Sequence, residues 1–132
     1  MQIRPFEAAD TGAAFQLLAA NGWGHRIASQ EHLGQLAAAS QRVLVAVERQ
    51  CVVGFARAIT DGLSNGYLSM VVVDAAHRGQ GIGTALVQHM VGTAPQVTWV
   101  LRAGRPGAAA FFRTLGFAAS SEAMERPRQG SG

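Results

Sequence analysis

The sequence predicts an α/β fold with a mixed central sheet, and three observations support that prediction. An apolar strand over residues 67–73 leads directly into a glycine-rich loop and an amphipathic helix, which is typical of a βα unit. Residues 43–47 and 52–59 are apolar segments separated by a short polar turn, which predicts an antiparallel hairpin. The 132 residues, of which 48% are apolar and 14% charged, suffice for the core of one domain. We therefore expect a single domain over residues 1–126 and a flexible tail over residues 127–132.

A short strand and two helices are predicted before the hairpin. Residues 3–6 predict the strand, and Asp10 or Thr11 is placed to cap the first helix, which ends at Asn21-Gly22. Ser29 is placed to cap the second helix. The side chains that follow helical spacing, and that we expect to face the core, are Phe15, Leu17 and Leu18 in the first helix and Leu33, Leu36 and Ala37 in the second.

Strands and helices alternate after the hairpin. The apolar run over residues 67–73 ends in three valines, which is typical of a strand covered on both faces in the middle of a sheet. A helix with Ile82, Ala85, Leu86 and Met90 on one face follows the glycine-rich loop. Residues 97–101 predict a strand parallel to the valine-rich one, because a right-handed βαβ crossover is the usual connection. Residues 105–115 predict a short helix, and residues 117–124 predict a last strand.

Composition excludes several classes of protein. All eleven cations are arginines scattered along the chain, so the net charge of +3 suits an anionic ligand without indicating nucleic acid. Cys51 is the only cysteine, which excludes an internal disulfide and a cysteine-rich metal site. No apolar run approaches the roughly 18 residues that cross a bilayer, and the first residues lack the apolar stretch of a signal peptide. We expect a cytoplasmic protein without a metal site.

The loop before the third predicted helix carries glycines at three alternate positions. Gly79, Gly81 and Gly83 allow a sharp turn in which successive backbone N–H groups face one point at a helix N-terminus. Such a point attracts anions, phosphate above all, and Arg78 adds a cation beside it. A tight turn that binds nothing is the alternative. The loop lacks the Gly-Lys-Ser/Thr ending of a P-loop, and it lacks the third glycine of a dinucleotide-binding loop because Leu86 stands there.

Two segments resemble motifs of one enzyme family. Arg78-Gly79-Gln80-Gly81-Ile82-Gly83 resembles the loop Gln/Arg-x-x-Gly-x-Gly/Ala of the GNAT superfamily of N-acetyltransferases, and Val71-Val72-Val73 precedes it where that superfamily has its fourth strand. The segment from Ala108 to Phe117, which reads Ala-Ala-Ala-Phe-Phe-Arg-Thr-Leu-Gly-Phe, resembles the superfamily's later helix. The order of elements is similar over nearly the whole chain. The resemblance implies a GNAT-like acyl-CoA N-acyltransferase fold, with a mixed sheet of about six to seven strands flanked by about four helices.

The resemblance also implies a donor and a reaction. The donor is acetyl-CoA, whose pyrophosphate would lie on the amides of residues 79–84 and whose pantetheine arm would pair with the backbone of Val71 and Val73 like an added strand. A strand amide near these valines would bind the thioester carbonyl and stabilise the oxyanion as a primary amine attacks directly in a ternary complex. The implied cofactor-binding residues are Val71, Val72, Val73, Arg78, Gly79, Gln80, Gly81, Ile82, Gly83 and Thr84.

Two positions depart from the superfamily's pattern, and both concern proton transfer. Phe112 stands where many members carry the tyrosine that protonates the leaving thiolate, and Tyr67 stands where histone-type members carry a glutamate base. Tyr67 and Asp61 are the catalytic candidates that remain. Tyr67 would share a strand face with Ser69, Val71 and Val73 and point its hydroxyl into the acceptor cleft, or else pack on the sheet. Asp61 would hold a cationic amine or take its proton through water, or else only form an Asp-Gly turn.

The acceptor does not follow from one sequence. Trp23 and His25 lie in the loop between the first two helices, which in the superfamily often lines the acceptor site, or they serve packing alone. A small amine, an antibiotic, an amino acid and a protein N-terminus stay open as acceptors. A non-catalytic acyl-CoA binding or sensing domain is the main alternative function, favoured by the missing tyrosine and glutamate. A nucleotide-phosphate binder of another fold is a further alternative. The resemblance also implies a homodimer.

Overall fold

The computed structural model describes residues 1–129 of the chain, so the last three residues of the expected tail lie outside the described residues. The chain divides into two compact units, Met1–Arg102 and Ala103–Gly132. No helix among the described residues has the length and apolar character that a bilayer crossing requires. The elements of the first unit are β1 (Gln2–Pro5), η1 (Ala8–Asp10), α1 (Thr11–Ala20), α2 (Gln30–Ala38), β2 (Arg42–Glu48), β3 (Cys51–Thr60), β4 (Asn65–Val73), η2 (Ala75–His77), α3 (Ile82–Val91) and β5 (Thr98–Leu101), and the second unit contains α4 (Ala108–Arg113).

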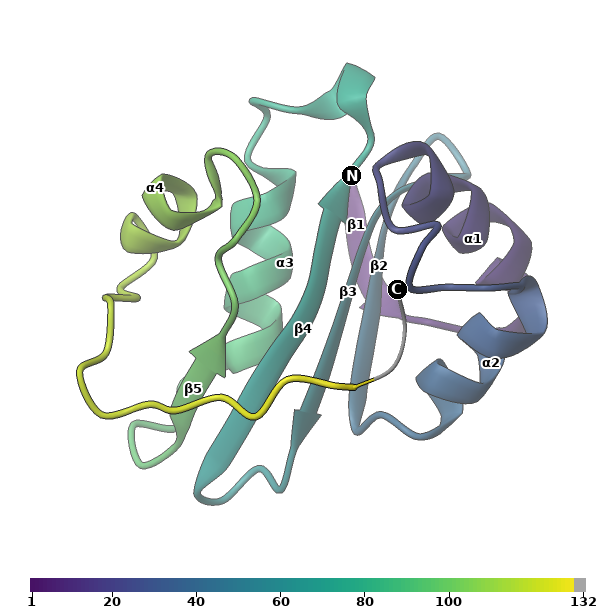
Figure 1. Cartoon of the computed structure of the whole chain (residues 1–132). Coiled ribbons are helices and arrows are strands. Elements are labelled where there is room, and N and C mark those ends of the chain that lie inside the picture. The colour runs from purple at the N-terminus through teal and green to yellow at the C-terminus, as the bar shows by residue number, and fades with distance from the viewer. Residues whose placement is uncertain (130–132) are drawn as a thin grey trace. The chain divides into compact units, whose positions relative to one another are not determined.

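The five strands form one mixed sheet in the order β1-β2-β3-β4-β5. The first four strands are antiparallel neighbours, whereas β4 and β5 are parallel and are connected through α3. Figure 1 shows α1 and α2 on one face of this sheet and α3 on the other. The predicted α/β fold with a mixed sheet and four α-helices is confirmed for the described residues, although the sheet has five strands instead of six or seven.

The strand predicted over residues 117–124 is wrong. These residues belong to no strand, and α4 is followed by a turn and then by irregular chain as far as the structure describes it. The segment Phe-Ala-Ala-Ser-Ser-Glu-Ala-Met contains no β-branched residue, so its intrinsic preference for a strand is weak. Phe117 instead packs on Phe112 within the second unit, with the ring centroids 5.7 Å apart.

One hydrophobic core lies between the sheet and the layer formed by α1 and α2. Ser29 caps α2 as predicted, because its hydroxyl accepts a hydrogen bond from the His32 N–H at 3.1 Å. Phe15 and Leu36 pack partly buried against the core. The buried residues of this core are Ala14, Leu17, Leu18, Ile27, Leu33, Val45, Phe55, Met70 and Val72. Two of them, Met70 and Val72, come from β4, so the strand expected to carry the site is anchored in this core.

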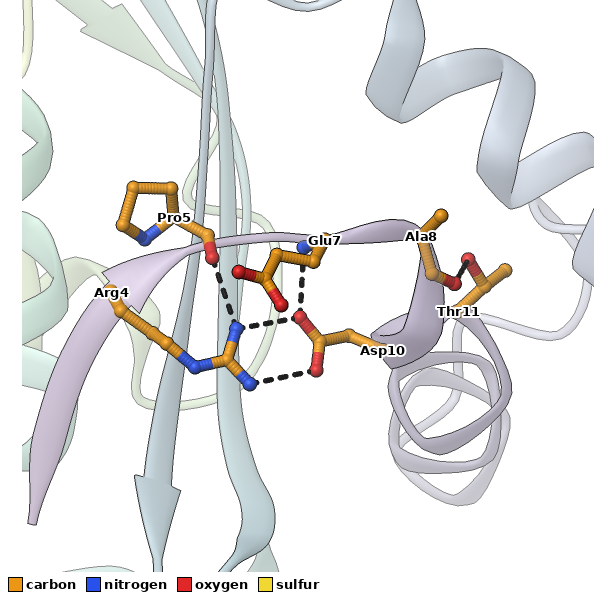
Figure 2. Close-up of polar contacts among 6 residues, drawn as sticks. All are labelled: Arg4, Pro5, Glu7, Ala8, Asp10 and Thr11. Carbon is orange, nitrogen blue, oxygen red and sulfur yellow. Dashed lines mark hydrogen bonds and ion pairs between the residues drawn. The ribbon is translucent and has the colours of Figure 1, made fainter.

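An ion pair between Arg4 and Asp10 joins β1 to the start of α1 (Figure 2). Asp10 precedes α1 as predicted for a cap, but its carboxylate accepts hydrogen bonds from Arg4 Nη1 (2.8 Å), Arg4 Nη2 (2.9 Å) and the Glu7 N–H (2.8 Å) instead of capping α1. The hydrogen bonds from Arg4 hold the pKa of Asp10 below its ordinary value, although burial acts in the opposite direction. The Thr11 hydroxyl donates to the Ala8 carbonyl at 2.7 Å and closes the same turn.

The predicted hairpin of β2 and β3 is confirmed, with a tighter turn than the sequence indicates. Glu48 pairs with Cys51, which leaves only Arg49 and Gln50 in the turn. Both turn residues have a positive φ, 50° and 66°, which is the conformation that matches the twist of a two-residue hairpin. Cys51 is therefore the first residue of β3, and it is exposed.

β4 lies inside the sheet as predicted, between β3 and β5, with α1 and α2 on one face of the sheet and α3 on the other (Figure 1). β4 is the fourth of five strands, and β5 beyond it has only four residues. Burial alternates along β4, because Gly66, Leu68, Met70 and Val72 are buried and the residues between them are only partly buried. Val71 and Val73 are only partly buried, and among the described residues no strand lies beside them on the β5 side, because β5 ends at Leu101.

Candidate functional site

β4 is paired differently in its two parts. Residues 65–68 pair with β5 at residues 98–101, and we call them the paired segment. Residues 69–73, here called the open segment, do not pair with β5, and residues 70–73 pair only with β3 among the described residues. Backbone groups on the far side of the open segment therefore have no strand to bind, and an extended ligand can pair with them in the way that an added strand does.

The backbone of Val71 and Val73 is directed toward this open edge. The Asp74 N–H donates a hydrogen bond to the Val53 carbonyl of β3 at 2.8 Å. Successive residues of an antiparallel strand direct their N–H and C=O groups to opposite sides, so Val73 and Val71 direct theirs away from β3. The Val73 carbonyl accordingly accepts a hydrogen bond from Arg78 Nε at 3.3 Å. Val72 lies between them and directs its backbone groups to β3.

A bulge at Ser69 separates the two segments of β4. On β3, Arg57 pairs with Met70, and the next residue, Ala58, pairs with Leu68. One step along β3 thus corresponds to two steps along β4, and Ser69 is the extra residue of β4. Bulges bend the strand that carries them and increase its local twist. The pairing between β4 and β5 ends at Leu68, so the bulge at Ser69 lies directly after the last paired residue.

The bulge also changes which side chains of β4 share a face. Tyr67 pairs with Ile59, which shares a strand face with Arg57. Val71 pairs with Ala56 and therefore lies on the opposite face. α3 covers that opposite face, since a Cβ at Gly54, two residues from Ala56, would lie 2.9 Å from Leu86 Cδ1. The common face predicted for Tyr67, Ser69, Val71 and Val73 is wrong, because strict alternation does not pass through a bulge.

The glycine-rich loop between β4 and α3 has the backbone conformation that its glycines allow. Gly79 and Gly81 have φ values of +77° and +82°, where other residues are strained, and an added Cβ at either position would meet no atom within 4 Å. Gly81 precedes α3, and the first intrahelical hydrogen bond runs from the Ala85 N–H to the Gly81 carbonyl at 3.0 Å. The N–H groups of residues 82–84 therefore stay outside the helix's own hydrogen bonding. They form a helix N-terminus of the kind that binds anions, at which Gly81 is exposed and Gly83 and Thr84 are partly exposed.

Arg78 connects this loop to α1. Its Nη2 donates a hydrogen bond to Asn21 Oδ1, and the Asn21 side-chain amide donates to the Leu17 carbonyl of α1 at 2.7 Å. Because Arg78 Nε also donates to the Val73 carbonyl, the guanidinium joins the end of β4 to the end of α1. The sequence predicted a cation beside the loop amides. It gave no signal for the partner Asn21.

Sequence reasoning missed Arg57, which lies on the same face of the sheet as Tyr67. Arg57 Nε donates to Ser40 Oγ at 2.7 Å, and Arg57 Nη1 donates to Ser69 Oγ at 2.9 Å. Burial lowers the pKa of Arg57 from its ordinary value, while a Coulombic interaction with Tyr67 acts in the opposite direction. The available signal was an arginine between two alanines in an otherwise apolar strand.

Asp61 forms the turn that leads into β4. Its Oδ1 accepts hydrogen bonds from the N–H groups of Leu63 (2.9 Å), Ser64 (2.8 Å) and Asn65 (3.1 Å). These hydrogen bonds lower the pKa of the Asp61 carboxyl from its ordinary value. The carboxylate is fully exposed and stabilised in its charged form, which suits binding of a cation better than removal of a proton.

The remaining predicted positions contribute packing contacts or lie in the second unit. Phe112 packs edge-on against Phe111, with ring centroids 5.0 Å apart, so the position without a tyrosine hydroxyl belongs to an aromatic cluster of the second unit. Trp23 packs partly buried against the core, and His25 is exposed. No three metal-ligating side chains gather among the described residues.

A surface depression of about 550 Å³ lies elsewhere in the first unit. It is bordered by the end of β1, by α2 and by the start of β2, and His89 of α3 also lines it. None of the residues predicted for the site lines this depression, so it is separate from the open segment and the glycine loop.

Comparison with known proteins agrees with this geometry. A model of the acetyltransferase (GNAT) family matches residues 12–117. No curated protein sequence matches the chain. Among solved structures, a GNAT family acetyltransferase from Streptococcus pneumoniae is 24% identical, with a TM-score of 0.77 over 99% of this chain and 98% of that chain.

Two further solved structures have the same fold. A ribosomal-protein-alanine N-acetyltransferase from Brucella melitensis biovar Abortus is 22% identical, with a TM-score of 0.77 over 98% of this chain and 100% of that chain. A transcriptional regulator from Bacillus halodurans is 22% identical, with a TM-score of 0.73 over 96% of this chain and 99% of that chain. At these identities the likeness shows the fold, and the different names show that the fold alone does not assign an acceptor.

Proposed function

Because the chain belongs to the GNAT acetyltransferase family, whose members transfer acyl groups from acyl-CoA, we propose that it moves the acetyl group of acetyl-CoA to a primary amine. The transfer takes place by direct attack of the amine in a ternary complex. The observation that carries the proposal is the open segment of β4, where Val71 and Val73 direct their backbone groups away from β3. This edge supplies main-chain hydrogen bonds to an extended pantetheine arm, as a strand does to an added strand.

The glycine-rich loop is the second feature that supports acetyl-CoA as the donor. A pyrophosphate carries negative charge, and the N–H groups of residues 82–84 at the start of α3 are outside the helix's own hydrogen bonding. The positive φ values of Gly79 and Gly81 let the backbone turn closely around such a group. The amides of residues 79–84 hold the pyrophosphate in this proposal, and Arg78 fixes the loop to α1 and the end of β4.

Acetyl transfer requires mainly that the amine is positioned against the thioester and that the developing oxyanion is stabilised. The Val71 N–H lies at the open edge, directly beyond the bulge, and it binds the thioester carbonyl as negative charge develops on the oxygen. Tyr67 lies in the paired segment and donates its hydroxyl proton toward the leaving thiolate or orients the amine. Asp61 binds a cationic group of the acceptor, because the lowered pKa of its carboxyl makes it a weak base.

The cofactor site is tested by calorimetric titration of acetyl-CoA into the protein and into the variant Gly83→Asp. Gly83 lies in the first turn of α3, where aspartate favours the helix, so the variant should fold. Its carboxylate would repel the pyrophosphate and weaken binding roughly a hundredfold. Gly83→Asn has nearly the same shape without the charge and should keep most of the affinity. Equal affinity of the two variants, or no binding by the folded wild type, would remove acetyl-CoA from this loop.

The transfer itself is tested by release of free CoA thiol from acetyl-CoA in the presence of a panel of primary amines. A second candidate function, a non-catalytic acyl-CoA binding domain, is favoured by Phe112, whose side chain has no hydroxyl and packs against Phe111 and Phe117. Binding of acetyl-CoA without thiol release in the presence of any amine would support that second candidate. Thiol release that requires one class of amine would support the transferase.

A further inference from the structure

Arg57 carries a positive charge that is partly withdrawn from water without an anionic partner. It lies in the middle of β3, where its neighbours Ala56 and Ala58 are fully buried. Its hydrogen-bond partners are two hydroxyl groups, Ser40 Oγ and Ser69 Oγ, and no carboxylate pairs with it among the described residues. A charge in such a place is normally paired, because burial without a counter-ion is unfavourable.

The two serine hydroxyls orient the guanidinium and leave one of its ends available. Ser40 in turn donates to the Leu36 carbonyl at the end of α2 at 2.6 Å, so Arg57 Nε is held near a helix C-terminus. Arg57 Nη1 is held by Ser69 of the bulge, whereas Nη2 has no hydrogen bond within the described residues. The buried side-chain polar atom without a partner among the described residues is Trp99 Nε1 and not Arg57 Nη2, so Arg57 Nη2 is at least partly in contact with solvent.

The position of Arg57 relates it to the reacting centre. Arg57 pairs with Met70, the residue before Val71, and it shares a face with Tyr67. Arg57 Nη1 is 2.9 Å from Ser69 Oγ, and Ser69 lies two residues before Val71, which is about 7 Å along a strand. The guanidinium therefore lies within about the length of a small molecule of the proposed thioester position. An acceptor amine that reacts there has its other groups close to Arg57.

We propose that Arg57 binds a carboxylate of the acceptor, and that the acceptor is therefore a free amino acid or a similarly small molecule that carries both an amine and a carboxylate. The inference rests on the proposed acetyl transfer and adds the class of acceptor to it. A guanidinium presents parallel N–H groups that match a carboxylate. A protein N-terminus has no carboxylate at this short distance from its amine, so it fits the geometry less well.

The first test compares acids with their amides and needs no variant. Thiol release from acetyl-CoA is measured with each of the common amino acids and with the matching amino acid amides, which have the same amine and side chain without the carboxylate. The acids should have values of kcat/KM about tenfold to a hundredfold higher than their amides, with the difference mainly in KM. Equal values for acids and amides would overturn the inference.

The second test changes Arg57. Arg57→Gln should abolish the preference for acids over amides, and Arg57→Lys, which keeps the charge but not the planar pair of donors, should keep part of it. Arg128→Gln removes one exposed arginine from the last described residues and controls for the change in net charge. All three variants should bind acetyl-CoA with unchanged affinity. Loss of acetyl-CoA binding in the folded Arg57 variants would instead assign Arg57 to the donor site and overturn the inference.

A third readout separates this inference from the proposed function. The side-chain Nε–Hε signal of Arg57 is followed by NMR while N-acetylglycine, and in a parallel experiment N-acetylglycinamide, is added. A saturable shift with the carboxylate and none with the amide supports the anion site even if no amine is acetylated. Absence of a shift with N-acetylglycine would overturn it, even if acetyl-CoA binds and other amines react.

Discussion

The two segments of β4 are neighbours in one strand, yet one stabilises the fold and the other is available to bind a ligand. The paired segment, residues 65–68, pairs with β5 along its whole length and with β3 from Gly66 onward, and the Trp99 ring of β5 lies directly over Gly66. The open segment, residues 69–73, has β3 on one side only among the described residues. Backbone that is fully paired contributes stability, whereas backbone with one open side is available to a ligand. β4 is therefore stabilised by pairing at one end and kept available to a ligand at the other.

The difference arises from two local features, the length of β5 and the bulge at Ser69. β5 has four residues and ends at Leu101, opposite Leu68. The next residue of β4 is Ser69, which has no partner on β3 because it is the extra residue of the bulge. The open segment is nevertheless not loose, because Met70 and Val72 are buried in the core. A rigid open edge of this kind presents its N–H groups in fixed directions, which a stabilised oxyanion requires.

The largest effect should come from placing proline at two adjacent positions of the open segment. Val72→Pro removes an N–H that is directed to β3, and we expect a loss of roughly 3 kcal/mol or more in the free energy of unfolding. Val71→Pro removes an N–H that is directed to the open edge, so the loss in stability should be clearly smaller. Chemical denaturation of both variants measures the difference.

The same pair of variants distinguishes stability from function. Val71→Pro should abolish measurable binding of acetyl-CoA in a folded protein, because an edge N–H and the local strand geometry are lost together. Val71→Ala keeps the N–H, and it should retain binding. If the two proline variants destabilise the protein equally, the assigned direction of the backbone groups is incorrect.

The paired segment is tested by Gly66→Ala. A Cβ at residue 66 would lie 2.5–2.8 Å from atoms of the Trp99 six-membered ring, which is closer than atoms can approach. The ring must move and the contact between β4 and β5 must loosen, and we expect a destabilisation of roughly 2 kcal/mol. Gly34→Ala in α2, where an added Cβ meets no atom within 4 Å, is the matched control. It should stabilise by about 0.5–1 kcal/mol, and a stabilising Gly66→Ala would show that the ring contact does not matter.

The sequence predicted the elements of this region but not the division of β4. The valine run and the glycine loop are local signals, and they correctly predicted a strand and, after the loop, the helix that carries Ile82, Leu86 and Met90. A bulge depends on the register between β4 and β3, which pairs Ala58 with Leu68 and Arg57 with Met70 and cannot be read from either strand alone. Strict alternation therefore placed Tyr67 on the face of Val71, and the structure places the two on opposite faces.

Arg57 was missed for a related reason. An arginine in a strand is normally read as a solvent-facing residue. Its function depends on Ser40 and Ser69, which come from the end of α2 and from the bulge. Neither partner is recognisable before the sheet register is known. Conversely, the strand predicted over residues 117–124 rested on a few apolar residues without β-branching, which is too weak a signal to specify pairing.

A smaller effect is expected for Tyr67→Phe, which concerns chemistry in the paired segment. The change removes only a hydroxyl from a partly buried ring, so the fold should be unaffected. If the hydroxyl handles a proton, kcat for acetyl transfer should fall about tenfold while the affinity for acetyl-CoA stays constant. Steady-state kinetics and calorimetry measure the two quantities. An unchanged kcat would leave Tyr67 as a packing residue of the sheet.

The smallest effect is expected at the turn that begins the paired segment. Asp61 Oδ1 accepts three backbone N–H groups, and the Ser64 carbonyl of the same turn accepts a hydrogen bond from the Thr98 N–H of β5 at 2.9 Å. The amides lower the pKa of Asp61 in the folded state. A lowered carboxyl pKa stabilises the fold above the unfolded pKa, about 3.9, and this contribution is lost as the pH falls through the folded pKa.

Asp61→Asn should therefore destabilise the protein at pH 7 and have less effect near pH 3. The asparagine oxygen still accepts the amides, so the pH-dependent difference reports only the charge of the carboxylate. Thermal unfolding of both proteins at the two pH values measures it, with Glu122→Gln as an exposed control that also removes one negative charge. A difference that is the same at both pH values would mean that the charge contributes nothing to the turn. The charge of Asp61 would then have no role in stability, and binding a cationic group of the acceptor would be its one proposed role.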